Sequence, residues 1–185
     1  MRALLMDGLL NRFVVNRLEP VVRAAGWVAR AAVLMLVVLV ATNVLLRYVL
    51  SWSPVGMQEA EWHLVSPIAL LGMAYAVYHR ADVRVDFLYE RFGPRTREGI
   101  DLLASLLTLA VGVLIATLAI PYVMQSYHTG EGSPDPGGLP YRYLLKVFIP
   151  LGFALLALQG LIDVLRAGAR LFSRAAPEDS REPRP

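Results

Sequence analysis

The sequence contains no cysteine and few charged residues. Among its 185 residues there is no Cys, and only 18% are Asp, Glu, Lys or Arg. The absence of cysteine excludes disulfide frameworks, iron-sulfur ligation and thiol catalysis. Soluble domains carry about 25% charged residues, whereas this chain is 56% hydrophobic, with a mean hydropathy of +0.50. Too few polar groups remain to cover a water-soluble surface, so we expect the chain to lie in a membrane.

Long apolar runs are abundant instead. Four stretches lack any charged side chain: residues 31–46, 63–79, 102–128 and 147–162. A run of 16 residues reaches about 24 Å as a helix, and the hydrocarbon core is about 30 Å thick. The shorter runs must therefore borrow flanking residues, whose arginine stems can extend to the headgroups. The pattern predicts an all-α membrane protein with four transmembrane helices, at about 26–48, 59–79, 102–127 and 143–164, within a membrane domain of residues 26–165.

The cations follow an alternating pattern between these spans. Residues 1–30, residues 80–101 and the segment after Ile162 hold five Arg each, whereas the other two loops hold Arg47 alone, and Arg142 with Lys146. Cytoplasmic loops are enriched in Lys and Arg. Both termini and the central loop are therefore predicted to be cytoplasmic. The net charge of +3 is explained by this topology, so we expect no nucleic-acid partner.

The cytoplasmic segments include two amphipathic candidates. Residues 1–25 resemble a cationic interfacial helix interrupted by Pro20. Between the second and third spans, four apolar residues lie at i, i+3, i+4 and i+7, the spacing of one helix face: Val85, Leu88, Tyr89 and Phe92. We expect a short helix there that lies at the inner membrane surface or against a partner. The charged, proline-rich tail, 166–185, is expected to be largely disordered.

The outer loop between the third and fourth spans is rich in turn-forming residues. The stretch from His128 to Tyr143 contains four glycines and three prolines. Asp135, Gly137 and Gly138 form a strong local turn signal. The turn can be purely connective, or it can contact a partner, and the composition leaves both interpretations open.

The spans lack the residues that catalysis or ion coupling needs. Intramembrane carboxylates or arginines typically mark such sites, yet the polar residues inside the runs are mild ones: Thr42, Asn43, Ser66, Ser105, Thr108, Thr117 and Gln159. The three histidines lie at span boundaries on both sides of the membrane, so they cannot share one metal or haem. We expect no enzymatic activity, catalytic residue, cofactor or metal. Arg47 is close enough in sequence to Glu59 and Glu61 for an ion pair at the outer interface, or these groups are separately solvated.

Two stretches resemble the small membrane subunit (DctQ-like) of tripartite ATP-independent periplasmic (TRAP) transporters. The first, residues 43–92, contains Arg-Tyr at the end of the first helix, Gln-Glu before the second, Leu-Gly within it, and the basic segment HRADVRVD. The second, residues 130–160, reads GEGSPDPGGLPYRYLLKVFIPLGFALLALQG. It looks like the last loop and helix of the mannitol/chloroaromatic-type branch.

The resemblance implies a four-helix scaffold subunit in the bacterial inner membrane. In that family the small subunit joins a large permease subunit that carries the sodium and substrate sites, while a periplasmic substrate-binding protein delivers an organic acid. The alternative is a self-associating four-helix membrane protein, such as a small exporter or an electron-transfer membrane anchor.

Overall fold

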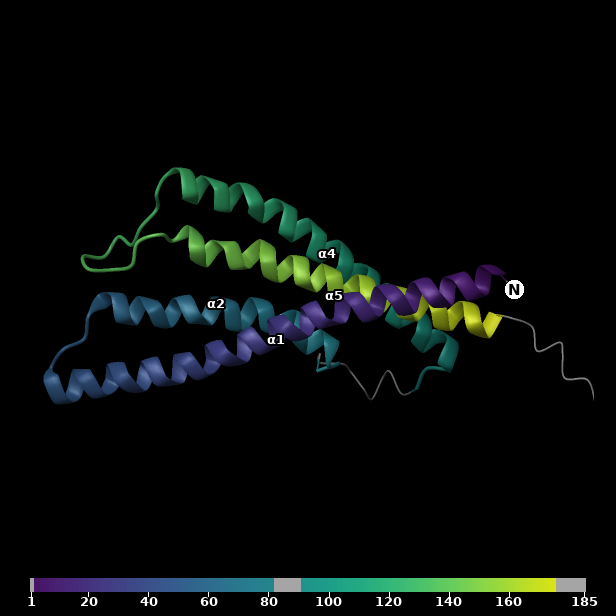
Figure 1. Cartoon of the computed structure of the whole chain (residues 1–185), viewed down its shortest axis with the longest axis horizontal. Coiled ribbons are helices and arrows are strands. Elements are labelled where there is room, and N and C mark those ends of the chain that lie inside the picture. Colours follow the sequence, from purple (N-terminus) through teal and green to yellow (C-terminus); the bar gives the residue numbers. More distant parts are fainter. Residues whose placement is uncertain (1, 82–90, 176–185) are drawn as a thin grey trace, which may run out of the picture.

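A computed structural model describes residues 2–81 and 91–175 of the chain. Over these residues it contains helices and no strand: α1 (Arg2–Leu50), α2 (Val55–Tyr78), α4 (Pro94–His128) and α5 (Tyr143–Ala175) (Figure 1). Each helix contains a stretch long and apolar enough to cross a membrane. The prediction of an all-α protein with four membrane-spanning helices is therefore confirmed.

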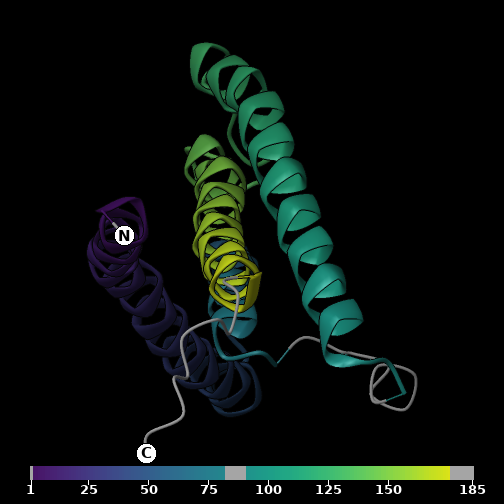
Figure 2. The ribbon, with the colours of Figure 1, turned by 90° about the vertical axis from the view of Figure 1, so that its right-hand side faces the viewer.

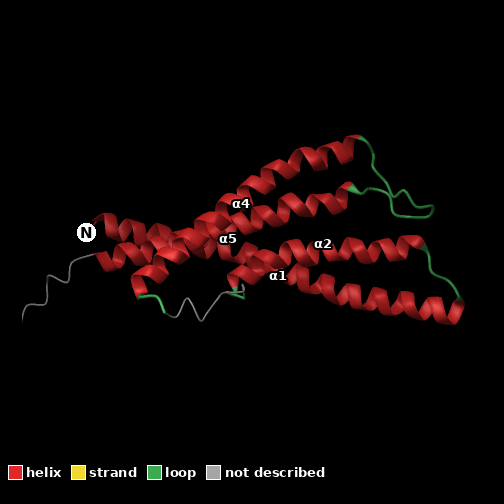
Figure 3. Cartoon of the chain, turned by 180° about the vertical axis from the view of Figure 1, so that it is seen from behind, coloured by secondary structure: helices red, strands yellow, loops and turns green. Residues whose placement is uncertain are grey.

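The helices form two hairpins joined through α5. Helix α5 packs against α1, α2 and α4, whereas α4 has extensive contacts only with α5 within the described part of the chain. Figure 2 shows α5 between α4 on one side and α1 with α2 on the other. The α1–α2 and α4–α5 loops lie at one end of the molecule, and the start of α1 and the end of α5 lie at the other (Figure 3). We call these the outer end and the inner end.

The helices differ in length. Helix α2 has 24 residues and is about 36 Å long, close to the hydrocarbon thickness, whereas the 35 residues of α4 span about 53 Å. A crossing of about 20 residues, or 30 Å, counted from each outer helix end would reach residues near Arg30, Tyr78, Thr108 and Asp163. Helices α1, α4 and α5 are therefore longer than a single crossing requires.

Small residues allow close helix packing. A Cβ built on Gly112 of α4 would lie 2.7 Å from the backbone nitrogen of Ala157 in α5, and a Cβ on Gly160 of α5 would lie 2.7 Å from that of Leu109. A Cβ on Gly152 would meet the backbone oxygen of Leu70 in α2, also at 2.7 Å. In a membrane no hydrophobic force drives helices together, so association depends on close packing, and small residues let the helix backbones approach. The glycines of α5 thus explain its central place.

Two predicted features differ from the structure or lie outside it. Helix α1 continues through Pro20, so residues 2–25 and the first predicted span form one helix without the predicted interruption. A helical proline removes a single donor and can be accommodated as a bend. Of the predicted interfacial stripe, Val85, Leu88 and Tyr89 lie outside the described residues, and Phe92 lies in the turn before α4 with its side chain 36% exposed. The interfacial helix stays a sequence-based prediction.

Candidate functional site

The outer loop is fastened to α2 by Glu59. The Glu59 carboxylate, in the first turns of α2, accepts hydrogen bonds from the hydroxyl of Ser133 and from the backbone N–H of Leu139 at 2.5 Å. The loop closes on itself where the N–H of Ser133 donates to the carbonyl of Leu139 at 3.1 Å. A Cβ on Gly138 would lie 2.5 Å from the Cβ of Ser133 and 2.8 Å from Glu59 Oε2, so a larger residue there would displace the side chains that fasten the loop.

A second carboxylate, Glu131, fastens the loop to α4 and α5. It accepts a hydrogen bond from Ser126 Oγ at 2.7 Å and forms an ion pair with Lys146 Nζ, which also lies 4.1 Å from the ring centre of Tyr122. The hydrogen bonds from Lys146 and Ser126 hold the pKa of Glu131 below its ordinary value of 4.5. We call the contacts of Glu59 and Glu131 together the outer latch, since they hold one loop against three helices.

The predicted turn residues lie at the tip of this latched loop. The N–H of Gly138 donates to the carbonyl of Asp135 at 3.0 Å, which closes the turn. Gly137 adopts a φ of 83°, a conformation that favours glycine. Asp135 and Gly137 are exposed, whereas Gly138 is half-buried against the latch. The turn lies beside the start of α2, since a Cβ built on Gly56 would be 3.2 Å from the carbonyl oxygen of Gly137, while Asp135 stays exposed.

The predicted residues Arg47 and Glu61 are connected through other side chains. Asn43, which is 4% exposed, donates to Glu61 Oε1 at 2.8 Å and accepts from Ser53 Oγ at 3.0 Å. Arg47 in turn donates to Ser53 Oγ at 3.2 Å. Among the interactions of the described residues, no direct ion pair joins Arg47 to Glu59 or Glu61. Ser53 and Asn43 lie between the charges, and Glu59 is occupied by the loop.

A polar network at the inner end was not predicted from the sequence. Arg166 of α5 forms ion pairs with Glu19 of α1 and, at 3.8 Å, with Asp163. Asp163 also accepts a hydrogen bond from Gln159 Nε2 at 3.0 Å, and Gln159 is fully buried. The spacing of Gln159, Asp163 and Arg166 on one helix face was a readable signal, but Glu19 is distant in sequence. Removing charges from water is costly unless they are paired, so the half-buried Arg166–Glu19 pair holds α1 against α5, whereas the Arg166–Asp163 pair lies within α5.

The polar side chains described at the outer and inner ends mainly attach helices and the outer loop to one another. Within residues 2–81 and 91–175, no group of three or more acidic or histidine side chains is placed to hold a metal ion. His63 contacts the carbonyl of Glu59 at 2.8 Å near the outer end, whereas His79 makes an edge-to-face contact with Tyr75 near the inner end. Most of these polar side chains contact a different helix or the outer loop, so they join helices to one another and to that loop.

Comparison with known proteins identifies a family. The family model described as "Tripartite ATP-independent periplasmic transporters, DctQ component" matches residues 36–170, which is more than half of the chain. The match begins within α1 and includes α2, α4, the outer loop and most of α5. No curated protein matches the chain.

Proposed function

The chain belongs to the DctQ component family of tripartite ATP-independent periplasmic transporters, and from this premise we propose that it is the small scaffold subunit that pairs with a large permease subunit. It is a multi-pass inner-membrane protein and a transporter component, a class that points away from enzymatic activity. The proposed complex imports an organic acid by sodium coupling, and a periplasmic substrate-binding protein delivers the acid. The mannitol/chloroaromatic-type branch is part of this proposal.

The observation that carries the proposal is the family match over four spans whose middle sections lack charge. No Asp, Glu, Lys or Arg lies in residues 31–46, 63–79, 102–128 or 147–162. Ion coupling and binding of an anionic substrate need charged or exposed backbone groups at membrane depth. The sodium and carboxylate sites are therefore proposed to lie on the large subunit. The polar contacts at both ends agree with a scaffold role, because they hold the helices in fixed positions.

The proposed orientation places both termini in the cytoplasm. The described arginines at the inner end include Arg17, Arg23, Arg95 and Arg170, whereas the outer end holds Arg47, Arg142 and Lys146. This asymmetry agrees with the positive-inside rule. The outer latch then faces the periplasm, on the side from which a binding protein arrives.

The latched loop is proposed as a contact for that binding protein. Its exposed tip, with Asp135 and Gly137, is held by Glu59 and Glu131, so a partner would meet a preformed surface. A preformed loop loses less conformational entropy on binding than a mobile one. The α4–α5 loop is accordingly proposed to act in recognition as well as in connection.

Two experiments test this function. A tagged chain coexpressed with the large permease subunit is expected to retain that subunit through purification in mild detergent; a chain that purifies alone would contradict the pairing. In proteoliposomes containing both subunits, Asp135→Arg is expected to raise the concentration of binding protein needed for half-maximal uptake. Arg95→Asp, an equal charge reversal at the exposed inner end of α4, serves as the control. An equal effect of both variants, or of neither, would contradict the loop contact.

A further inference from the structure

The inner half of the α1–α2 hairpin carries positive side chains without acidic ones. No Asp or Glu lies in residues 20–58 or 62–81, whereas Arg23 and Arg30 both lie on the inner half of α1, where they are exposed. They are seven residues apart, or about two helical turns, and so share one face of α1. Glu19, one turn before Arg23, is paired with Arg166 of α5. This face of α1 therefore presents two arginines whose charge no acidic side chain of the hairpin offsets.

Aromatic rings hold the Arg30 guanidinium in position. It lies 4.5 Å from the ring centre of Trp27 and 4.7 Å from that of Tyr75, whose hydroxyl accepts a hydrogen bond from Arg30 Nη2. Tyr75 is itself held, because a Cβ on Gly26 would overlap its ring and because the ring of His79 meets it edge-on, with centres 4.4 Å apart. A guanidinium has five N–H donors. Arg30 therefore keeps donors for an anion after its bond to Tyr75.

The two arginines are placed to contact one headgroup. The Arg30 side chain extends back along α1 to the ring of Trp27, three residues nearer the inner end. Trp27 lies four residues, or about 6 Å, from Arg23 along the helix. Within the described part of the chain, the Arg23 side chain has no hydrogen bond or ion pair of its own. We call Arg23, Trp27, Arg30 and Tyr75 the arginine edge.

Charged and apolar residues are separated along this face of α1. Arg30 directly precedes the uncharged run of residues 31–46. On the membrane side of Arg30 the same face continues with Leu34, Val37 and Val38, whose side chains are 61–69% exposed. A phospholipid has the same order of parts, with a charged phosphate followed by acyl chains. The face can therefore contact both parts of one lipid at once.

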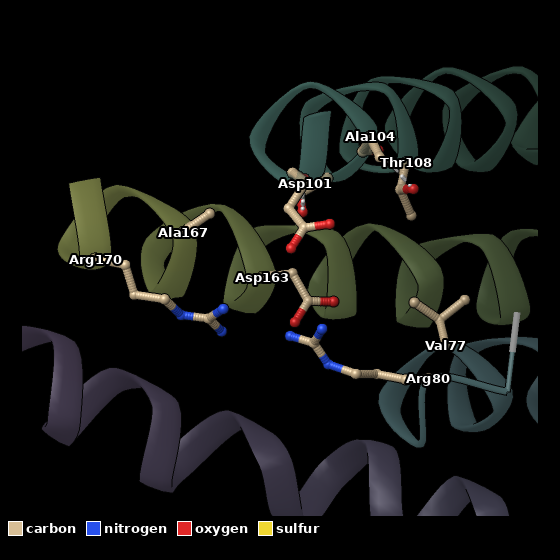
Figure 4. Close-up of a pocket in the computed structure, with 9 residues that line it drawn as sticks. Val77, Arg80, Asp101, Ala104, Thr108, Asp163, Ala167 and Arg170 are labelled. Atoms are coloured by element: carbon tan, nitrogen blue, oxygen red, sulfur yellow. Dashed lines mark hydrogen bonds between the residues drawn. The ribbon is translucent and has the colours of Figure 1, made fainter. Parts of the chain in front are cut away.

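The other arginines near the inner end of α2 have acidic neighbours. Arg80 and Arg170 point into a pocket between α2, α4 and α5 that Asp101 and Asp163 also line (Figure 4). Asp163 is already engaged, since it accepts a hydrogen bond from Gln159 at 3.0 Å. Carboxylates beside arginines offset their charge, so an anion is favoured at the arginine edge over this pocket.

From these observations we propose that the arginine edge binds the headgroup of an anionic phospholipid. Arg23 and Arg30 donate to the phosphate oxygens, because guanidinium groups form strong, charge-assisted hydrogen bonds with phosphate. Basic sites between membrane helices bind anionic headgroups in this way. A zwitterionic headgroup fits less well, since its ammonium group would lie beside two guanidinium groups. The inference goes beyond the transport function and does not depend on the identity of the permease.

The first test measures lipid binding to the chain of 185 residues, purified in detergent and delipidated. Native mass spectrometry with equimolar 1-palmitoyl-2-oleoyl phosphatidylglycerol, phosphatidylethanolamine and phosphatidylcholine is expected to show preferential retention of phosphatidylglycerol. Arg23→Gln and Arg30→Gln are each expected to weaken its binding about tenfold, since each removes a charge-assisted contact. Arg95→Gln removes the same charge from an exposed arginine at the inner end of α4, and it is expected to bind like the unchanged chain.

A second test locates the lipid by fluorescence. The chain has three tryptophans, so Trp52→Phe with Trp62→Phe leaves Trp27 as the only one. Phosphatidylglycerol with brominated acyl chains is expected to quench Trp27 more strongly than brominated phosphatidylcholine does. In the matched control, Trp27→Phe with Trp52→Phe, the remaining Trp62 lies near the outer end of α2, and the two lipids are expected to quench it equally.

Each other outcome overturns the proposal. Equal retention of the three lipids would mean that no headgroup site exists. An equal loss of binding in Arg95→Gln and Arg30→Gln would mean general attraction to a basic surface, with no site at the arginine edge. Displacement of the lipid by an equal concentration of soluble glycerophosphoglycerol would assign the edge to a soluble anion. The lipid competition on the unchanged chain gives a result even if a variant fails to fold.

Discussion

Replacement of Gly112 by alanine is expected to separate α4 from α5. The added Cβ would lie 2.7 Å from the nitrogen, 2.8 Å from the Cα and 2.9 Å from the Cβ of Ala157. Contacts this short do not occur, and two of the three atoms belong to the backbone, so α4 must move. Overpacking of this kind costs typically 1–3 kcal/mol. A gain of up to about 1 kcal/mol in helix propensity offsets part of it, which leaves a net loss of up to about 2 kcal/mol.

The matched control is Gly99→Ala, the same substitution on the same helix. No atom lies within 4 Å of a Cβ built on Gly99, and Gly99 is exposed near the start of α4. Only the propensity gain applies, so this variant is expected to be unchanged or more stable by about 0.5–1 kcal/mol. Gly160→Ala, which would place a Cβ 2.7 Å from the backbone nitrogen of Leu109, is expected to behave like Gly112→Ala.

The assay is reversible unfolding of the full chain in mixed micelles by titration with sodium dodecyl sulfate, followed by tryptophan fluorescence and circular dichroism. We expect the midpoints to fall for Gly112→Ala and Gly160→Ala and to stay constant or rise for Gly99→Ala. Equal midpoints for Gly112→Ala and Gly99→Ala would refute the account of how α4 is held. The reasoning would also fail if Gly160→Ala were as stable as the unchanged chain.

Three further predictions concern the outer latch and the orientation. Glu59→Gln is expected to weaken the attachment of the outer loop, measured as faster reaction of a cysteine placed at Asp135 with a maleimide; an unchanged rate would contradict the role of Glu59. The lowered pKa of Glu131 means that its contribution to stability is present above about pH 4.5 and is lost as the pH falls through the lower folded pKa. This contribution is measured as the change in thermal unfolding temperature between pH 6 and pH 3. Glu131→Gln should reduce that change, whereas the same change in the variant and the unaltered chain would exclude the contribution. Because the chain has no native cysteine, cysteines at Gly99 and Asp135 report topology cleanly: the first should be labelled only from the cytoplasm and the second only from the periplasm, and the reverse pattern would invert the orientation.

The fold was predictable because its main determinant is local in sequence. Four uncharged runs predict four spans, and the structure places a helix over each of them. Helix lengths were less predictable. The third charge-free run begins at Leu102, but α4 begins eight residues earlier, at Pro94. A helix can continue past the apolar run where its residues favour helix, and proline suits the first turn.

The candidate sites were predictable in part. Composition identified the turn of Asp135, Gly137 and Gly138, but it gave no sign that Glu59 holds this loop from about 75 residues away in the chain. The nearness of Arg47 to Glu59 and Glu61 in sequence left an ion pair and separate solvation both open, and the intervening Ser53 and Asn43 became visible only in three dimensions. Contacts between distant segments depend on helix rotation and crossing, which spacing within a single helix does not specify.

The central claim is that this chain supports transport carried out by a large permease subunit. The most direct measurement is uptake of radiolabelled organic acid by cells that contain the large subunit and the binding protein, with and without this chain. Sodium-dependent uptake is predicted to disappear when the chain is deleted and to return when it is supplied from a plasmid. Uptake that stays unchanged after the deletion would contradict the claim.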